Sequence, residues 1–304
     1  MPRTTVACRG SFNGARLMGL FVAVGQQALR IASKDGVAWT HEEIGKEGET
    51  LRAVAYGNGI FAAVGGFGWG DQLMAYSRDG LDWHITPKTK QTNYRSLFFG
   101  QGKFLAMSGD PGQVGDAKPV VAVSTDGIAW SEPKRISGQW LIRRLAFGNG
   151  VFVGVGDRGR RSVSPDGLEW QDVPGTKAVD TLIDVAFGSG VFVGVGMHGL
   201  RTHSRDGLLW SEPERGLEGE HLNSVVWARD HFVAVGAGAT WLSADGAKWN
   251  RVPNQDAPLT CLFGDGAFLG ANWKGRILRS PDGVAWTQVH KCAQHVEGLA
   301  FGAV

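Results

Sequence analysis

Arginine recurs at one fixed place in a repeated pattern of this chain. Arg52, Arg95 and Arg143 each stand four residues before an aromatic residue that is followed by glycine. Arg144 comes directly after Arg143. Guanidinium groups that lie together bind carboxylate, sulfate or phosphate through paired hydrogen bonds. A fold that brings these four side chains to one place would therefore create a site for an anion.

The same arginines have a structural alternative. Glu297 and Asp184 occupy matching depths in other copies of the pattern, so salt bridges between the copies would neutralise part of the positive charge. Tyr94 precedes Arg95 and is the tyrosine that stands where a segment begins, so we expect it to border the anion site.

Tryptophan stands outside the repeated pattern at four of its 12 positions. Trp69, Trp140 and Trp273 fall in loops, and Trp241 falls in a short apolar segment. An exposed indole ring costs solubility, and such a ring commonly stacks on a sugar or contacts a protein partner. We expect Trp69 and Trp273 at the outer rim of the anion site. The alternative is that each ring packs beneath its own loop.

Carboxylates in the longer loops are weaker candidates. Asp110 and Asp116 lie in an insertion, residues 108–119, that also carries Lys118, and Asp71 lies in another loop. The spacing within the insertion is not that of an EF-hand, so it does not indicate a calcium site. Paired carboxylates can perform acid–base catalysis, but aspartate is also common in turns, and the turn interpretation is favoured.

The spacing of the histidines and cysteines indicates neither a metal site nor a redox-active cysteine pair. His198, His221 and His295 could reach the central opening, but none has a second ligand at a metal-binding spacing. The three cysteines form no Cys-x-x-Cys pair and cannot all pair with one another. Free thiols are favoured, and a Cys8–Cys292 link near the joined ends of the chain is the alternative. We expect no metal and no cofactor.

The elements that must position these residues follow from a second motif, Ser-x-Asp-Gly-x-x-Trp, called the Ser–Asp turn below. Its seven copies are Ser33–Trp39, Ser77–Trp83, Ser124–Trp130, Ser164–Trp170, Ser204–Trp210, Ser243–Trp249 and Ser280–Trp286. A motif that recurs about every forty residues indicates a repeat protein. Aspartate accepts hydrogen bonds from its own turn, and the tryptophan supplies a large ring for packing between repeats.

Each repeat contains four short apolar runs, and tight turns join the first to the second and the third to the fourth. The copy from Leu145 to Gly156 is typical, because two apolar runs flank Gly-Asn-Gly, a hairpin signal. No segment shows a helical period. Four-stranded repeats of this length predict an all-β fold, a seven-bladed β-propeller of four-stranded antiparallel blades.

The two ends of the chain complement each other. Residues 296–304 read as a first strand without a second, whereas Leu20–Gly25 reads as a second strand without a first. We expect the C-terminal strand to complete the first blade and close the ring, which removes an exposed sheet edge. In the rival interpretation Val6–Gly10 is the missing strand. With the C-terminal strand in the first blade, the whole chain, 1–304, is one propeller domain, and residues 1–18 are an N-terminal leader.

Propeller geometry also predicts where ligands bind. The tight turns share one rim, and the longer connections, from the fourth strand to the next blade and from the second strand to the third, share the other. Variable loops on a rigid scaffold are the usual binding surface. The ligand-binding candidates on that rim are Arg52, Arg95, Arg143, Arg144, Trp69, Trp273 and Tyr94.

Composition narrows the class of partner. The net charge is +2, too close to neutral for a general nucleic-acid or membrane-surface binder. No apolar run approaches the roughly 20 residues of a membrane span. The N-terminus lacks the apolar stretch of a signal peptide. A cytoplasmic location is expected if Met1 is the native start, and a secreted or periplasmic one if a signal peptide was removed.

The Ser–Asp turn resembles a one-residue-shorter form of the Asp box, Ser-x-Asp-x-Gly-x-x-Trp, of sialidase-like propellers, sortilin-type receptors and photosystem II assembly factors. Val-Gly-x-x-Gly, a short strand and then the Ser–Asp turn is most similar to the assembly factors. The resemblance covers residues 19–304 and implies the propeller fold. Sialidase activity does not carry over, because Arg30-Ile31 is followed by Ala32 instead of proline, and no Tyr–Glu pair matches.

These features predict a binding or assembly module that holds a glycan or a protein partner on the loop rim. The alternative is a carbohydrate-active enzyme, a sialidase-like hydrolase or a polysaccharide lyase, with an arginine-lined pocket. An enzyme requires a titratable pair within reach of one point in an enclosed site, whereas a protein-binding module requires a flatter surface. The sequence carries no indication of the oligomeric state.

Overall fold

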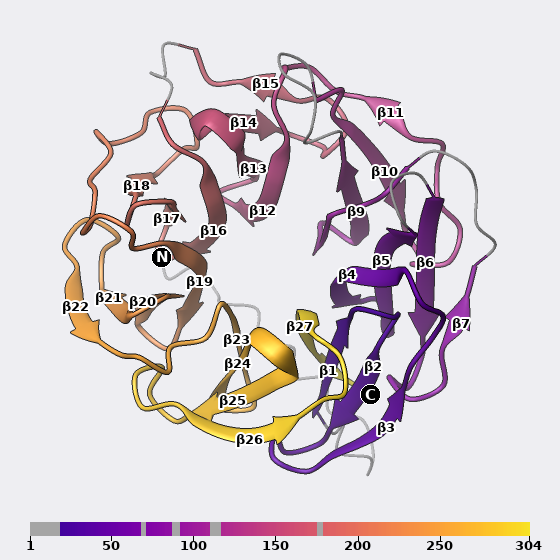
Figure 1. Ribbon diagram of the computed structural model, residues 1–304. Coiled ribbons are helices and arrows are strands. Elements are labelled where there is room, and N and C mark those ends of the chain that lie inside the picture. Colours follow the sequence, from indigo (N-terminus) through magenta and orange to yellow (C-terminus); the bar gives the residue numbers. More distant parts are fainter. Residues whose placement is uncertain (1–18, 68–70, 87–91, 110–116, 175–178) are drawn as a thin grey trace, which may run out of the picture.

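The computed structural model describes residues 19–67, 71–86, 92–109, 117–174 and 179–304. In it, seven antiparallel sheets stand in a ring around a central opening (Figure 1). The prediction of an all-β, seven-bladed propeller is confirmed. Among the described residues, helical structure is limited to two 3-10 turns, η1 (Asp157–Gly159) and η2 (Trp273–Gly275). None of the described helices has the length and apolar character needed to cross a membrane.

The blades are built in chain order, except that the first joins both ends of the chain. From the innermost strand outward they are blade 1, β27 (Val296–Ala303), β1 (Gly19–Gly25), β2 (Arg30–Ser33) and β3 (Trp39–Glu43); blade 2, β4 (Glu49–Gly57), β5 (Ile60–Phe67), β6 (Asp71–Ser77) and β7 (His84–Ile85); blade 3, β8 (Ser96–Gly100), β9 (Lys103–Ser108), β10 (Val120–Ser124) and β11 (Lys134–Arg135); blade 4, β12 (Ile142–Gly148), β13 (Val151–Gly156), β14 (Arg161–Ser164) and β15 (Gln171–Asp172); blade 5, β16 (Leu182–Gly188), β17 (Val191–Gly196) and β18 (Arg201–Ser204); blade 6, β19 (Leu222–Ala228), β20 (His231–Gly236), β21 (Ala239–Ser243) and β22 (Asn250–Pro253); and blade 7, β23 (Thr260–Gly264), β24 (Ala267–Asn272), β25 (Arg276–Ser280) and β26 (Thr287–Lys291).

The fourth position of blade 5 departs from the others. There the chain meets β18 only through isolated bridges, Arg201 with Glu214 and Ser204 with Trp210. Pro213 lies between the two bridges and has no backbone N–H to donate; Pro133 occupies the equivalent place in blade 3, where β11 pairs only beyond it.

The C-terminal strand closes the ring. β27 pairs antiparallel with β1 and places Phe301 opposite Phe21. The prediction that the C-terminal strand completes the first blade is thereby confirmed for residues 296–303, the span of β27. Residues 6–10, the rival candidates for this strand, lie outside the described part of the chain, and the position beside β1 belongs to β27.

Aromatic rings fill the same position between blades all around the ring. In every blade the aromatic near the end of the innermost strand lies 4.6–4.8 Å, centroid to centroid, from a phenylalanine of the second strand. In blades 1, 2, 4, 5 and 7 a glycine follows that aromatic and lies against the equivalent ring of the next blade. A Cβ on Gly148, for example, would come within 2.3 Å of Phe187. The aromatic–glycine pair of the sequence is thus an inter-blade contact.

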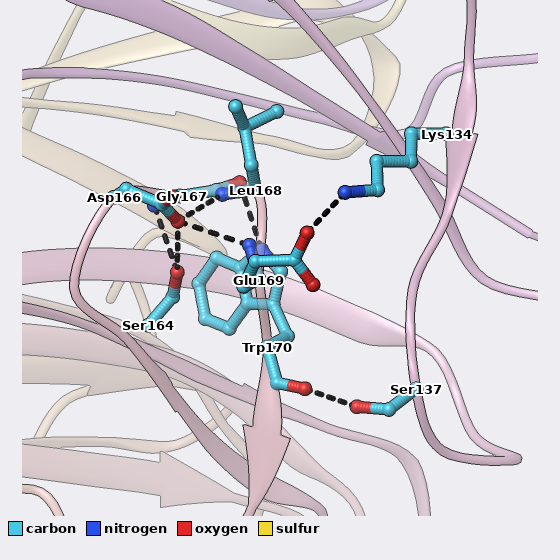
Figure 2. Close-up of polar contacts among 8 residues, drawn as sticks. All are labelled: Lys134, Ser137, Ser164, Asp166, Gly167, Leu168, Glu169 and Trp170. Atoms are coloured by element: carbon cyan, nitrogen blue, oxygen red, sulfur yellow. Dashed lines mark hydrogen bonds and ion pairs between the residues drawn. The ribbon is translucent and has the colours of Figure 1, made fainter.

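The Ser–Asp turns stabilise the rim on which the tight turns lie, and Figure 2 shows the turn of blade 4. Asp166 Oδ1 accepts hydrogen bonds from the N–H groups of Leu168, at 2.8 Å, and Glu169, at 2.9 Å. These bonds, with Glu169 the stronger, lower the pKa of Asp166. Ser164 Oγ accepts from the N–H of Gly167 at 2.8 Å, and that glycine has a φ of 79°.

The same bonding recurs in all the copies, so the prediction that the aspartates bond their own turns is confirmed. Figure 2 also shows how neighbouring blades are joined. Lys134 of blade 3 forms an ion pair with Glu169 of blade 4, and Ser137 donates a hydrogen bond to the carbonyl oxygen of Trp170.

Candidate functional site, an arginine-lined pocket at the central opening

A β-bulge lies near the start of the innermost strand in five blades, where one extra residue interrupts the pairing with the second strand. The extra residues are Glu297, Arg52, Arg143, Ile183 and Asn223. A bulge redirects side chains that would otherwise alternate between the two faces of a sheet. In blade 4 it allows two consecutive arginines, Arg143 and Arg144, to line the same pocket.

A glycine in the second strand makes each bulge possible. A Cβ on Gly156 would lie 1.8 Å from the carbonyl oxygen of Leu141, and a Cβ on Gly65 would lie equally close to that of Thr50. The equivalent contacts are 1.9 Å for Gly25, 2.1 Å for Gly196 and 1.7 Å for Gly236. No side chain fits at these distances. The Val-Gly pair that ends the second strand is therefore the sequence signal of the bulge.

The structure brings all four candidate arginines together. Arg52, Arg95, Arg143 and Arg144 line one cavity of about 170 Å³ at the central opening. Glu297 is the carboxylate in its wall, and Ser108, Leu141, Ile142 and Ile183 complete the lining. Because the arginines come from three successive blades, only the curvature of the ring makes them neighbours.

Contacts within the protein compensate the arginine charge in part. Arg143 Nε lies 2.5 Å from Asp157 Oδ1, and Arg52 Nε donates to Asn93 Oδ1 at 3.2 Å. Arg144 donates to the carbonyl oxygen of Arg143 at 3.0 Å. In the described parts of the chain, no carboxylate lies within 4.0 Å of the guanidinium of Arg52 or Arg144. The salt-bridge alternative therefore holds for Arg143, with a loop carboxylate of its own blade.

A second layer of polar residues lies one position deeper. It encloses about 160 Å³ and contains Ser96, Arg144, Asp184, Ser224 and Thr260. The carboxylate of Asp184 is enclosed by protein, although part of the residue reaches the opening, and this burial raises its pKa. The attraction of Arg144 and the hydrogen bonds to the carboxylate oppose that rise.

Those bonds tie three successive blades together along the wall of the opening. Asp184 Oδ2 accepts from Ser224 Oγ at 3.0 Å and from the N–H of Val225 at 2.9 Å, and Oδ1 accepts from its neighbour Val185 at 2.9 Å. Ser224 Oγ also accepts from the N–H of Cys261 at 3.2 Å. Burial raises the pKa of the Cys261 thiol to about 12, so it stays protonated. The sequence places these residues at equivalent repeat positions, but it did not indicate this network.

The aromatic candidates separate into exposed and buried rings. Trp273 is 64% exposed and stacks on His295, with 5.1 Å between the ring centroids. Tyr94 is 1% exposed and packs with Val64 and Met74. The expectation that Tyr94 borders the pocket is therefore corrected: its ring fills space between blades 2 and 3. Trp69 lies outside the described residues.

The other loop tryptophans lie against arginines. Trp140 is half-buried and lies 5.1 Å from the guanidinium of Arg158. Trp241 is 8% exposed, with Arg201 stacked 4.1 Å above its ring. For these two, packing within the protein is the better interpretation.

The remaining candidates contribute little to the pocket. Asp110, Asp116 and the side chain of Asp71 lie outside the described residues, and Lys118 is exposed. The N–H of His198 in blade 5 donates to Nδ1 of His221 at 3.1 Å, which joins blade 5 to the start of blade 6. Within the described ranges, no three of the His, Cys, Asp and Glu side chains are grouped to hold a metal. Cys261 and Cys292 are buried free thiols, and Cys8 is not among the described residues.

The connections from second to third strand are shorter than the sequence suggested. In blades 4, 5 and 7 they are tight turns in which Arg158, His198 and Lys274 have φ values of 56°, 55° and 61°. The sequence did not indicate this, because glycine or asparagine usually occupies such positions. In blade 3, by contrast, residues 109–119 separate β9 from β10 in the sequence.

Comparison with known proteins establishes the fold and no family. No protein-family model and no curated protein sequence matches the chain. A solved structure described as YCF48 bound to D1 peptide has a TM-score of 0.61 at 17% identity, over 82% of this chain and 83% of that one. Sqt1 of Saccharomyces cerevisiae has a TM-score of 0.62 at 11% identity, covering 91% and 84%. The computationally designed Ika8 protein has 0.60 at 12%, covering 94% and 87%.

Proposed function

We propose that the chain is a binding or assembly module that holds a protein partner through an acidic side chain seated in the arginine pocket. The observation that carries this proposal is charge: four guanidinium groups and one carboxylate line a single cavity of about 170 Å³. Asp157 pairs with Arg143, and cations this close together repel one another unless further anions offset them. Guanidinium groups also match a carboxylate geometrically, through bidentate hydrogen bonds.

The size of the pocket favours one group of a larger partner over a whole small molecule. Clefts that bind small molecules are typically about 300–1,000 Å³, whereas this cavity measures about 170 Å³. A carboxylate side chain needs little space, and the rest of its chain would then lie across the rim. The propeller solved as YCF48 bound to D1 peptide supports the proposal as an example of this fold with a peptide ligand.

The chemistry of the pocket favours binding over catalysis. A glycoside hydrolase uses two carboxyl groups directed at one bond. Both oxygens of Asp184 already accept hydrogen bonds from the protein, which leaves Glu297 as the free carboxylate in the lining. We also infer that the Ser–Asp turns make this chain a divergent Asp-box propeller. This relationship predicts the fold of the chain, but it does not identify the ligand.

The test is a charge-removing variant, Arg52→Gln/Arg95→Gln/Arg143→Gln, probed with an array of acidic peptides and their glutamine counterparts. A matched control, Lys34→Gln/Arg78→Gln/Arg205→Gln, removes three exposed cations from the second position of Ser–Asp turns on the other rim. The parent and the control should retain acidic peptides at about 0.02 M salt and lose them towards about 0.3 M, because exposed charge pairs are screened.

The pocket variant should bind the same peptides at least about ten-fold more weakly, the effect of losing one good charged contact. Equal binding by the pocket variant and the parent would refute the proposal. An acidic-glycan array run in parallel tests the other partner class. Arginine-dependent retention of glycans without any retention of peptides would replace the protein partner with a glycan.

A further inference from the structure

Trp273 is the one aromatic side chain among the strongly exposed apolar residues of the described chain, with 64% of its surface accessible. One face of the indole is occupied, because His295 stacks on it nearly in parallel, at an interplanar angle of 13°. Exposure of a large ring is unfavourable in water. The free face is therefore available to a partner.

The local backbone holds this ring in place. Asn272 Oδ1 accepts a hydrogen bond from the N–H of Trp273 at 2.8 Å. Gly275 has a φ of 74°, and a Cβ there would lie 2.5 Å from the carbonyl oxygens of Cys292 and Gln294. The N–H of Cys292 also donates to the carbonyl of Gly275 at 2.8 Å. The turn η2 is thus tied to the segment that carries His295, and a ligand would find both rings already ordered.

The His295 ring stands close in the chain to a residue that lines the arginine pocket. His295 precedes Glu297 by two residues, and Glu297 lines the pocket together with Arg52. Extended chain advances about 3.3 Å per residue, so about 7 Å of backbone separates the stack from the pocket wall. Trp273 follows β24 and His295 precedes β27, so both stand on the rim where the pocket opens.

We propose that Trp273, backed by His295, is a stacking subsite for an apolar ring of the same partner, a proline or aromatic residue two to three positions from the seated acidic residue. This inference rests on the proposed function. The spacing follows from the backbone distance above, because an extended ligand advances at the same rate per residue. A ring stacked on the free indole face would remove apolar surface from water on both partners.

The experiment is a thermodynamic cycle with synthetic peptides that bear an acidic residue plus tyrosine, or the same acidic residue plus alanine, three positions apart. Each is titrated against the parent, Trp273→Ala and Trp273→Phe. Trp273→Ala should weaken the tyrosine peptide about 3–10-fold, the usual value of an aromatic pair, and leave the alanine peptide unchanged. Trp273→Phe should restore most of the loss. Leu209→Ala, at a residue 80% exposed on the opposite rim, is the matched control.

The outcomes separate this inference from the proposed function. If acidic peptides bind through the arginines but the tyrosine peptide is insensitive to Trp273→Ala, the stacking subsite is wrong and the pocket stands. Equal weakening of both peptides, or a lowered melting temperature, would mean that Trp273 is structural, which also overturns the subsite. If glutamine counterparts bind as well as acidic peptides, both proposals fail.

Discussion

Replacing Gly196 with alanine tests whether glycine is required opposite the β-bulges that shape the pocket. A Cβ on Gly196 would lie 2.1 Å from the carbonyl oxygen of Thr181 and 2.9 Å from Cα of Leu182. Gly194 lies two residues earlier in the same strand, β17, and is also buried. A Cβ there would meet its nearest atoms at 3.6 Å, an ordinary contact. Gly194→Ala is therefore a matched control.

The magnitudes follow from these distances. To accept the new methyl group, β16 and β17 must separate by about 1 Å, an overpacking that costs about 1–3 kcal/mol. The hydrogen bond from Met197 N–H to the Thr181 carbonyl, at 3.1 Å, would also weaken, by up to about 1 kcal/mol. Replacing glycine by alanine at a compatible position has the opposite effect, because it restricts the unfolded chain and stabilises by about 0.4–1 kcal/mol.

The restriction of the unfolded chain is common to both variants and cancels, so they should differ by about 1–4 kcal/mol in unfolding free energy, with Gly196→Ala the less stable. At about 2–4 °C per kcal/mol for a large domain, the melting temperatures should differ by about 2 °C or more. Calorimetry and urea titration measure this difference. Equal stability of the two variants would refute the role given to glycine opposite the bulge.

Three further predictions concern the scaffold. Asp206→Ala should lower stability by about 1–2 kcal/mol, because the N–H groups of Leu208 and Leu209 lose a charged acceptor in a largely exposed turn; loss of peptide binding at an unchanged melting temperature would contradict this role. Hydrogen bonding lowers the pKa of this aspartate, so its stabilisation is present above the unfolded pKa, about 3.9, and is lost as pH falls through the folded value. The urea midpoint should thus fall less between about pH 6 and about pH 3 for Asp206→Ala than for the parent. An equal fall in the two proteins would mean that the hydrogen bonds of the turn do not cause this pH dependence. Deleting residues 298–304 removes most of β27 and exposes the edge of β1. The truncated protein should aggregate or lose cooperative unfolding, as measured by light scattering and urea titration. A soluble protein that still unfolds cooperatively would favour residues 6–10 as the strand beside β1.

The sequence by itself determined the scaffold, because the signals involved are local or periodic. Each Ser–Asp turn forms its hydrogen bonds within four residues, so seven copies of the motif predict seven turns. The aromatic–glycine pair recurs in the same register in six of the seven blades and predicts an inter-blade contact there. The unmatched strands at the two ends predicted the pairing of β27 with β1, because an open blade would leave an edge exposed.

Alignment of the repeats also placed Arg52, Arg95 and Arg143 at equivalent depths, which predicted their convergence at the opening. Only the tertiary structure decided how they converge. The bulge that turns Arg143 and Arg144 to one side depends on pairing with β13, and the carbonyl that excludes a side chain at Gly156 comes from another strand. Register between strands is a non-local property, so a single segment does not specify it.

Burial of individual rings was likewise decided by packing. Tyr94 and Trp273 both stand where a strand begins or ends, yet one is 1% exposed and the other 64%. Tyr94 fills space between the sheets of two blades, whereas Trp273 lies in the turn η2, where its ring stacks on His295. The physical reason is that a ring becomes buried when a neighbouring blade leaves room for it, and that room depends on how the blades meet.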